Sequence, residues 1–179
     1  MSRSSGHTLF VAACLMMALA GTLFAAPAAA DTKYKACSRL TPADLGTVLT
    51  PPVSKVQDGD TVVDSGAYKG ATVSSCTWRS GLKVVALRIW PAPTTPEQRN
   101  VGMKALQQDE TLRQAGYTVV PANLPGAECY TLKPPAYLSA SSSTAACTVV
   151  TKGIAFWLKG PVSVQQVKTL SDKVAARLP

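Results

Sequence analysis

The sequence predicts an α+β domain: an antiparallel sheet of about five or six strands packed by two to three helices, disulfide-stapled. Three observations support this class. Runs of alternating apolar residues are joined by Ser80-Gly81 and by Lys152-Gly153, as in β-hairpins. Helical patterns lie at 38–49 and 163–178. Four cysteines follow an export signal, which favours two disulfide bonds.

The first thirty residues have the three parts of a secretory signal peptide. Arg3 precedes an apolar run from Leu9 to Phe24, and small residues extend to Ala30. The run is shorter than the roughly 20 residues of a membrane-spanning helix. We therefore expect a signal peptide over residues 1–30, a single mature domain over 31–179 with no transmembrane segment, and a periplasmic or secreted location.

A lipoprotein signal is the alternative for processing. Val11-Ala12-Ala13-Cys14 has the small-residue form of a bacterial lipoprotein cleavage site, which would leave a lipid on Cys14. Only Leu9 to Ala13 would then remain as the apolar region before the cut. Cleavage after Ala30 uses the whole run, so the sequence favours it.

The first element expected in the mature chain is a short helix within 38–49. Thr41 can cap it, Pro42 suits the first helical position, and Asp44 lies where the helix dipole favours an anion. Its buried face would consist of Leu45, Val48 and Leu49.

A polar stretch, 57–70, follows, and its turn signals predict at most short strands. A hairpin of strands 71–79 and 82–90 comes next. One side of the second strand carries Val85, Leu87 and Ile89. The other side carries Leu82, Val84, Ala86, Arg88 and Trp90. Apolar residues on both sides predict a central strand covered on two faces.

A second helix is expected over 95–115, ending at Gly116 and resting on the sheet as a surface helix. Strands over 117–121 and 128–132 would follow, joined by a turn. An exposed loop is expected over 133–143, where prolines and serines are frequent.

The last two elements have the clearest local signals. A hairpin of 144–151 and 154–159 alternates so that Trp157 points away from the core. Ser163 and Gln166 then form a capping box at the start of the final helix. The apolar stripe of that helix comprises Val164, Val167, Leu170, Val174 and Leu178.

Four cysteines remain after residue 30, and an even count in an exported chain indicates a disulfide framework. Three pairings are possible. We favour Cys37 with Cys76 and Cys129 with Cys147, because each pair ties an element to a strand in its own half of the chain. No C-x-x-C spacing supports a four-thiolate metal site or a redox pair.

The one histidine, His7, lies in the expected signal peptide, so the mature domain would contain none. This excludes Ser-His-Asp and Cys-His nucleophile activation, and histidine-ligated zinc or haem. A hydrolase would have to use other groups, of which Asp44, Glu128 and Tyr130 are the candidates. We expect no catalytic residue, no cofactor and no metal ligand.

Two short motifs are better explained as turns. Ser80-Gly81-Leu82-Lys83 fits the Ser-x-x-Lys pattern of penicillin-recognising acyl enzymes but falls on the expected hairpin. Asp58-Gly59-Asp60 with Asp64 suggests a calcium loop, but Lys69 stands where the closing glutamate of an EF-hand would be. Solvated side chains are expected at both motifs.

Arg88 and Trp90 are the candidate ligand-binding pair. They share one side of a strand, and a cation beside an aromatic ring can hold anionic or sugar-like ligands. The alternative role of Trp90 is core packing. The 18 Lys and Arg against 10 Asp and Glu are dispersed, which favours an anionic surface polymer, a lipid or an envelope protein as partner and, for an exported chain, no nucleic acid.

The opening Ala36-Cys37-Ser38-Arg39-Leu40-Thr41, a helix, and then Ser75-Cys76-Thr77-Trp78 resemble small exported bacterial envelope proteins and lipoproteins of unknown function. A looser likeness includes Leu124-Pro125-Gly126-Ala127-Glu128 with Tyr130. The resemblance implies an envelope location and no established activity.

Three functional classes follow from these observations. The first is a non-catalytic exported binding or inhibitor domain of the bacterial cell envelope. The second is a carrier of a small apolar or amphipathic ligand, held between sheet and helices. The third is a histidine-free hydrolase.

Overall fold

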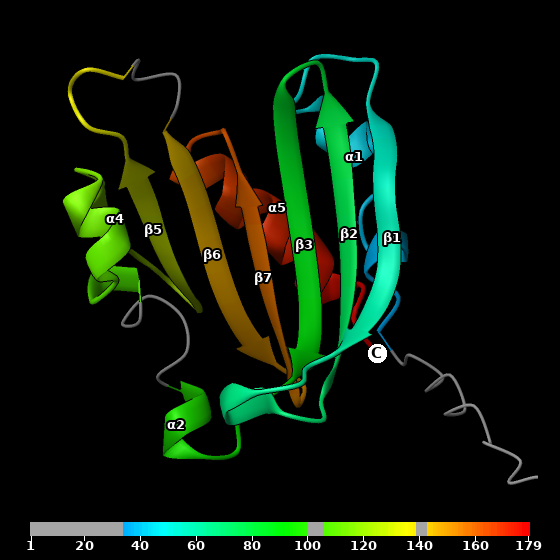
Figure 1. The fold of residues 1–179 in the computed structure, drawn as a ribbon. Coiled ribbons are helices and arrows are strands. Elements are labelled where there is room, and N and C mark those ends of the chain that lie inside the picture. Colours follow the sequence, from blue (N-terminus) through cyan, green and yellow to red (C-terminus); the bar gives the residue numbers. More distant parts are fainter. Residues whose placement is uncertain (1–33, 100–105, 139–142) are drawn as a thin grey trace, which may run out of the picture.

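The computed structural model describes residues 34–99, 106–138 and 143–179 (Figure 1). The strands are β1 (Ser54–Val62), β2 (Thr72–Ser80), β3 (Lys83–Pro91), β4 (Thr118–Leu124), β5 (Ala127–Lys133), β6 (Thr144–Thr151) and β7 (Ile154–Gly160). The helices are α1 (Pro42–Gly46), α2 (Pro96–Arg99), α4 (Glu110–Gln114) and α5 (Val164–Ala176), with 3-10 turns η1 (Ala36–Ser38) and η2 (Gly66–Tyr68).

All seven strands form one antiparallel sheet in the order β1-β2-β3-β7-β6-β5-β4. The α+β class and the antiparallel sheet agree with the sequence prediction. The expected five or six strands and two to three helices do not, since the described residues contain seven strands and four α-helices.

The additional strand is β1, which lies at the edge of the sheet. Every residue of β1 is exposed, so the strand has no alternation of buried and exposed positions. The expectation of at most short strands over 57–70 was wrong for this reason, because alternation is the sequence signal of a strand. The edge strand carries charged side chains, and its pairing with β2 has a register shift between Lys55 and Gln57. Both features are common where a strand has no second neighbour.

Both expected hairpins are present. The turn between β2 and β3 has Gly81 at a φ of +58°. The turn between β6 and β7 has Lys152 at +50° and Gly153 at +72°, the left-handed pair of a type I′ turn. Pairing of β3 with β7 joins the two hairpins at the centre of the sheet.

One face of the sheet carries the hydrophobic core. Figure 1 looks onto the opposite face, with α5 and α1 behind the strands. The helix α5 begins at the capping box of Ser163 and Gln166, as expected. Fully buried core side chains include Leu45, Leu49, Val85, Leu87, Ile89, Phe156, Leu158, Val167, Leu170 and Val174.

The prediction that β3 is covered on two faces was wrong. The strand is central, between β2 and β7, but the described α1 and α5 pack on the side of Val85 and Leu87. On the other side Arg88 is exposed and Trp90 is half-buried. The Tyr68 ring of η2 packs against Trp90 and covers part of it, whereas no described helix covers the rest of β3 on this side. The sequence pattern cannot distinguish such partial cover from burial under a helix.

The expected helix over 95–115 is interrupted. Residues 100–105 lie outside the described part of the chain, and beyond them Asp109 is non-helical. Its carboxylate accepts a hydrogen bond from the backbone N–H of Leu112 at 3.1 Å and caps α4. Figure 1 places α4 beside β5 at the edge of the sheet and α2 beyond the strand ends. Gly116 follows α4 with a φ of +78°.

Two disulfide bonds staple the fold, in the pairing that the sequence favoured. Cys37–Cys76 ties η1 to β2. Cys129–Cys147 joins directly opposed residues of β5 and β6. None of the described helices has the length and apolar character needed to cross a membrane. The expected signal peptide, 1–30, and Cys14 fall outside the described residues.

Candidate functional site

The face of the sheet opposite α5, called here the open face, carries the candidate site. Its residues alternate with the core residues along each strand. From β2 to β5 they include Ser75, Thr77, Arg79, Ala86, Arg88, Trp90, Ala155, Trp157, Lys159, Thr148, Val150, Glu128 and Tyr130. The open face combines aromatic, cationic and hydroxyl side chains.

Trp157 lies on β7, the middle strand of the sheet, and two cations lie near its ring. Arg88 is directly opposite Trp157 in the β3–β7 pairing, and the guanidinium carbon of Arg88 is 5.8 Å from the centroid of the indole. Lys159, two residues along β7, places Nζ 5.7 Å from the same centroid. Both distances are within the range of cation–π attraction. Two positive charges therefore lie next to one indole ring.

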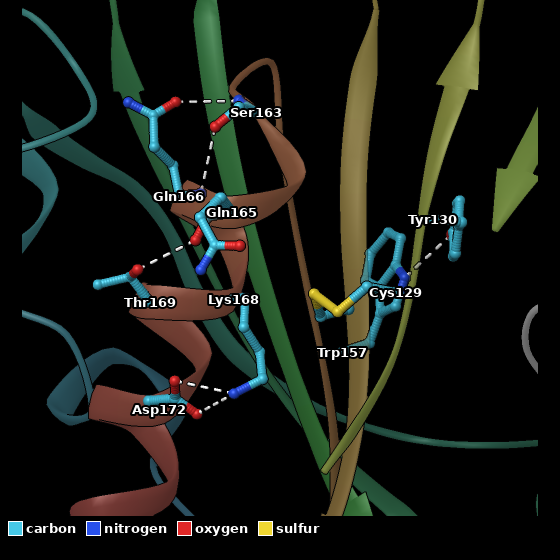
Figure 2. The surroundings of a disulfide bond; sticks show 10 residues. Cys129, Tyr130, Trp157, Ser163, Gln165, Gln166, Lys168, Thr169 and Asp172 are labelled. Atoms are coloured by element: carbon cyan, nitrogen blue, oxygen red, sulfur yellow. Dashed lines mark hydrogen bonds and ion pairs between the residues drawn. A yellow bond between two sulfur atoms is a disulfide. The ribbon is translucent and has the colours of Figure 1, made fainter. Parts of the chain in front are cut away.

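The orientation of Trp157 is held from β5. Its indole Nε1–H donates to the hydroxyl oxygen of Tyr130 at 3.3 Å, as Figure 2 shows next to Cys129. Tyr130 is buried, and burial raises the pKa of its phenol, although the hydrogen bond from Trp157 opposes this. The phenol is thus neutral at physiological pH and serves as a hydrogen-bond acceptor for the indole.

Two adjoining grooves run over the open face. The smaller, of about 430 Å³, is lined by three aromatic side chains, Tyr68, Trp90 and Trp157, and by Arg88 as its charged residue. The larger, of about 680 Å³, shares Tyr68, Trp90 and Thr148 with the first. Both volumes fall in the range of small-molecule sites.

The 3-10 turn η2 and the helix α2 together form one wall of the grooves. The Tyr68 ring packs edge-on against Trp90, with centroids 6.2 Å apart. Gln98 of α2 donates from Nε2 to the carbonyl of Ala67 at 3.0 Å, and the Tyr68 hydroxyl donates to the Gln98 carbonyl at 3.4 Å. The hydrogen bonds hold α2 to η2, and the Tyr68–Trp90 contact joins this wall to β3.

The electrostatics of the open face are positive at its centre. Within the described residues Arg88 makes no hydrogen bond or ion pair. Arg79, on β2, adds a third cation to this face, and Glu128, lining the larger groove, is an acid on the same face. An anion entering the smaller groove would therefore meet uncompensated positive charge.

The expected pair Arg88 and Trp90 does share one face, and both residues line the smaller groove. The aromatic ring that Arg88 covers is Trp157, however, which the sequence analysis did not include in a site. Alternation along β7 had already turned Trp157 away from the core. The β3–β7 pairing that brings it to Arg88 joins residues 69 positions apart and has no local sequence signal.

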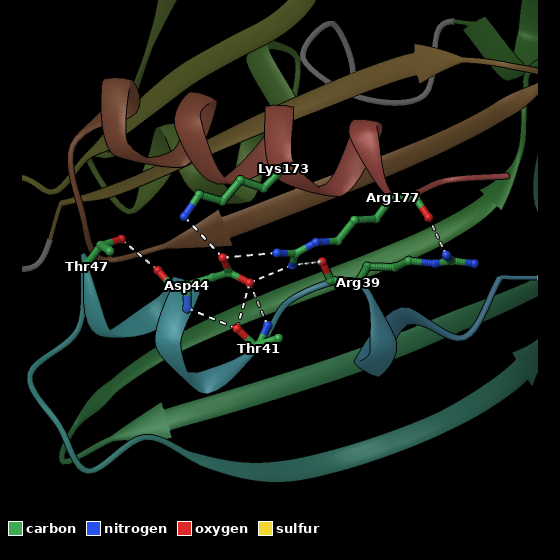
Figure 3. Close-up of polar contacts among 6 residues, drawn as sticks. All are labelled: Arg39, Thr41, Asp44, Thr47, Lys173 and Arg177. Atoms are coloured by element: carbon green, nitrogen blue, oxygen red, sulfur yellow. Dashed lines mark hydrogen bonds and ion pairs between the residues drawn. The ribbon is translucent and has the colours of Figure 1, made fainter.

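The three candidate hydrolase residues do not face one cleft. Asp44 lies on the helical side, where it accepts hydrogen bonds from Thr41 of its own helix cap, from Lys173 of α5 and from Arg177, which follows α5 (Figure 3). Glu128 and Tyr130 belong to the open face on the other side of the sheet. Asp44 therefore cannot share a catalytic site with Glu128 and Tyr130.

The Ser80–Lys83 motif lies at the hairpin turn, as expected, but Asp58-Gly59-Asp60 lies within the edge strand β1 and not in a turn. Ser80 donates to the carbonyl oxygen of Thr50, and Lys83 is opposite Ser80 in the hairpin. Asp58 forms an exposed ion pair with Lys55 at 3.0 Å on β1. Over the described ranges, histidine, cysteine, aspartate and glutamate form no group of three or more that could hold a metal ion.

No protein-family model, curated protein or solved structure matches this chain. The likeness of the Ala36–Thr41 opening to exported envelope proteins remains an expectation from the sequence. The chemistry of the open face is the basis on which function can be argued.

Proposed function

We propose that the mature chain is a non-catalytic, exported binding domain of the bacterial cell envelope, and that it binds its target with the open face. One observation carries the proposal: the cationic groups of Arg88 and Lys159 both lie within cation–π distance of Trp157, on a sheet face that α1 and α5 leave uncovered. Aromatic and arginine side chains are the residues that most often dominate binding surfaces.

The two disulfides support the exported location, since such bonds persist in oxidising compartments. Processing after Ala30 would leave both bonds in the mature chain. For protein isolated from its own envelope, we expect the intact mass of a chain whose first residue is Asp31. A mass that includes Cys14 with an acyl modification would instead show a lipid-anchored form.

Site-specific photo-cross-linking tests the binding surface. A photoreactive residue replaces Val150, an exposed residue that lines the larger groove, or Gln165, an exposed residue of α5. Irradiation in intact envelopes should give one defined adduct from position 150 and none from position 165. Adducts of equal yield from both positions, or an adduct from position 165 alone, would contradict the proposal.

A carrier of a small apolar or amphipathic ligand is the second candidate. The adjoining grooves favour it, because their combined lining is rich in aromatic and small apolar residues. They differ from the sequence expectation in position, since the space between sheet and α5 is filled by core side chains. Native mass spectrometry of gently isolated protein should show a bound small molecule that denaturation releases.

A further inference from the structure

We infer that the two grooves bind a fatty carboxylate, with its carboxylate on Arg88 and its hydrocarbon chain along the larger groove. The inference rests on the proposed function and specifies the ligand class. Three features of the open face support it: a guanidinium that no described carboxylate pairs with, aromatic walls around it, and an apolar path that leads away from it.

The guanidinium of Arg88 fits a carboxylate head group. It is the charged group of the smaller groove, and among the described residues no carboxylate pairs with it. A guanidinium presents parallel N–H donors that match the two oxygens of a carboxylate. Lys159 also lies over the Trp157 ring but is not among the residues that line the smaller groove. Because Arg88 is the charged residue among the described residues that line the smaller groove, the groove matches a head group of single charge.

The walls next to Arg88 fit a hydrocarbon chain. Trp90 and Tyr68 line both grooves, so a chain that starts at Arg88 continues over Trp90 into the larger groove. There it would meet further apolar side chains. These are Pro93, Leu124, Ala127, Val150 and Ala155. Burial of about 25 cal/mol per Å² of apolar surface makes this contact the main source of affinity.

The position of Glu128 sets the direction of the ligand. Glu128 lines the larger groove, whereas Arg88 lines the smaller one. A carboxylate head group placed beside Glu128 would meet a like charge, while one placed at Arg88 meets an opposite charge. The head group therefore binds at the Arg88 end of the open face.

Calorimetric titration of the disulfide-bonded mature protein with decanoate tests the inference. Decanol, which has the same chain and no charge, is the matched ligand control. We expect saturable decanoate binding at one site and at least about tenfold weaker binding of decanol, because a charge-assisted hydrogen bond is lost. Equal affinities for the two would overturn the role of the carboxylate.

Arg88→Gln and Arg79→Gln form the matched protein pair. Both remove one cation from the open face, but Arg79 lies outside the two grooves. Decanoate affinity should fall about tenfold in Arg88→Gln and stay within about twofold of wild type in Arg79→Gln. Equal losses would show a general charge effect and overturn the site. Unchanged far-ultraviolet circular dichroism verifies that both variants are folded.

Failure of this inference is distinguishable from failure of the proposed function. Absence of decanoate binding, or binding to phosphatidylglycerol vesicles alone, would overturn the fatty carboxylate as ligand. The cross-link from position 150 would still report binding through the open face. Decanoate affinity that is unchanged in Arg88→Gln would place the ligand elsewhere on the protein and would also overturn the inference.

Discussion

Asp44 illustrates how one side chain joins two distant parts of the chain. Its carboxylate accepts from the Thr41 N–H at 2.9 Å, from Arg177 at the C-terminal cap of α5 at 2.6 Å and from Lys173 of α5 at 3.1 Å. Arg177 also donates to the carbonyl of Arg39 at 2.9 Å, and Arg39 donates in return to the carbonyl of Arg177. The helix cap at Asp44 could be predicted from Thr41 and Pro42, whereas the partners more than 120 residues away could not.

Asp44→Asn should lower the free energy of unfolding by about 2 kcal/mol, as measured by urea denaturation at neutral pH. The carboxylate is 10% exposed but its cationic partners are near 40%, so the loss lies between those of surface and buried ion pairs. Asp172→Asn is the control. Asp172 is 62% exposed and pairs with Lys168 within one helix. Loss of this ion pair should lower the free energy of unfolding by less than about 0.5 kcal/mol.

The same residue makes stability depend on acid pH. The Arg177 guanidinium, with Thr41 and Lys173, holds the pKa of the Asp44 carboxyl well below its usual range, although burial opposes the shift. A lowered folded-state pKa contributes stability above the unfolded value of about 4, and this contribution is lost as the pH falls below it. The stability gap between wild type and Asp44→Asn should therefore shrink from pH 7 to pH 3 in urea titrations. A gap that stays constant would contradict the shift.

At the scale of elements, the sequence predicted the features that depend on adjacent residues but not those that depend on pairing between distant strands. The hairpin turn at Lys152-Gly153 and the α5 cap at Ser163 each depend on a few adjacent residues, and both were predicted within a residue. The strand β1 was missed because its stability comes from pairing with β2 and not from a buried face. The site at Trp157 was missed for a related reason, since β3 and β7 meet only through the sheet order.

The two disulfides should differ in their contribution to stability. Their cysteines are 39 and 18 residues apart, for which loop-closure entropy gives about 4 and about 3 kcal/mol. Replacing Cys37 and Cys76 by alanine should thus destabilise the fold more than replacing Cys129 and Cys147. Backbone pairing of β5 with β6 also remains after the second bond is removed. Urea midpoints of the two double variants measure the difference, and the reverse order would contradict this account.

The whole molecule is a two-layer fold in which the two faces of one sheet have separate roles. Core side chains of β3 and β7 interlock with α1 and α5 on one face, so the sheet keeps its shape without the other face. The open face can then vary in side chains at small cost in stability and carry a binding site. Sequence pattern alone did not separate the faces, because β3 has apolar residues on both.

Val84 and Val85 allow a direct comparison of the two faces of the sheet. They are the same residue type at adjacent positions of β3, and their side chains point to opposite faces. Val85 is 1% exposed in the core, and its Cγ2 lies against Gly160 of β7, whereas Val84 is half-buried on the open face. Val85→Ala should cost about 2 kcal/mol and Val84→Ala less than about 1 kcal/mol in urea denaturation. Both variants lose the same strand propensity, so the difference isolates burial by the helical layer. Equal costs would mean that the open face is covered as tightly as the core, and a face in that state could not serve as the binding surface.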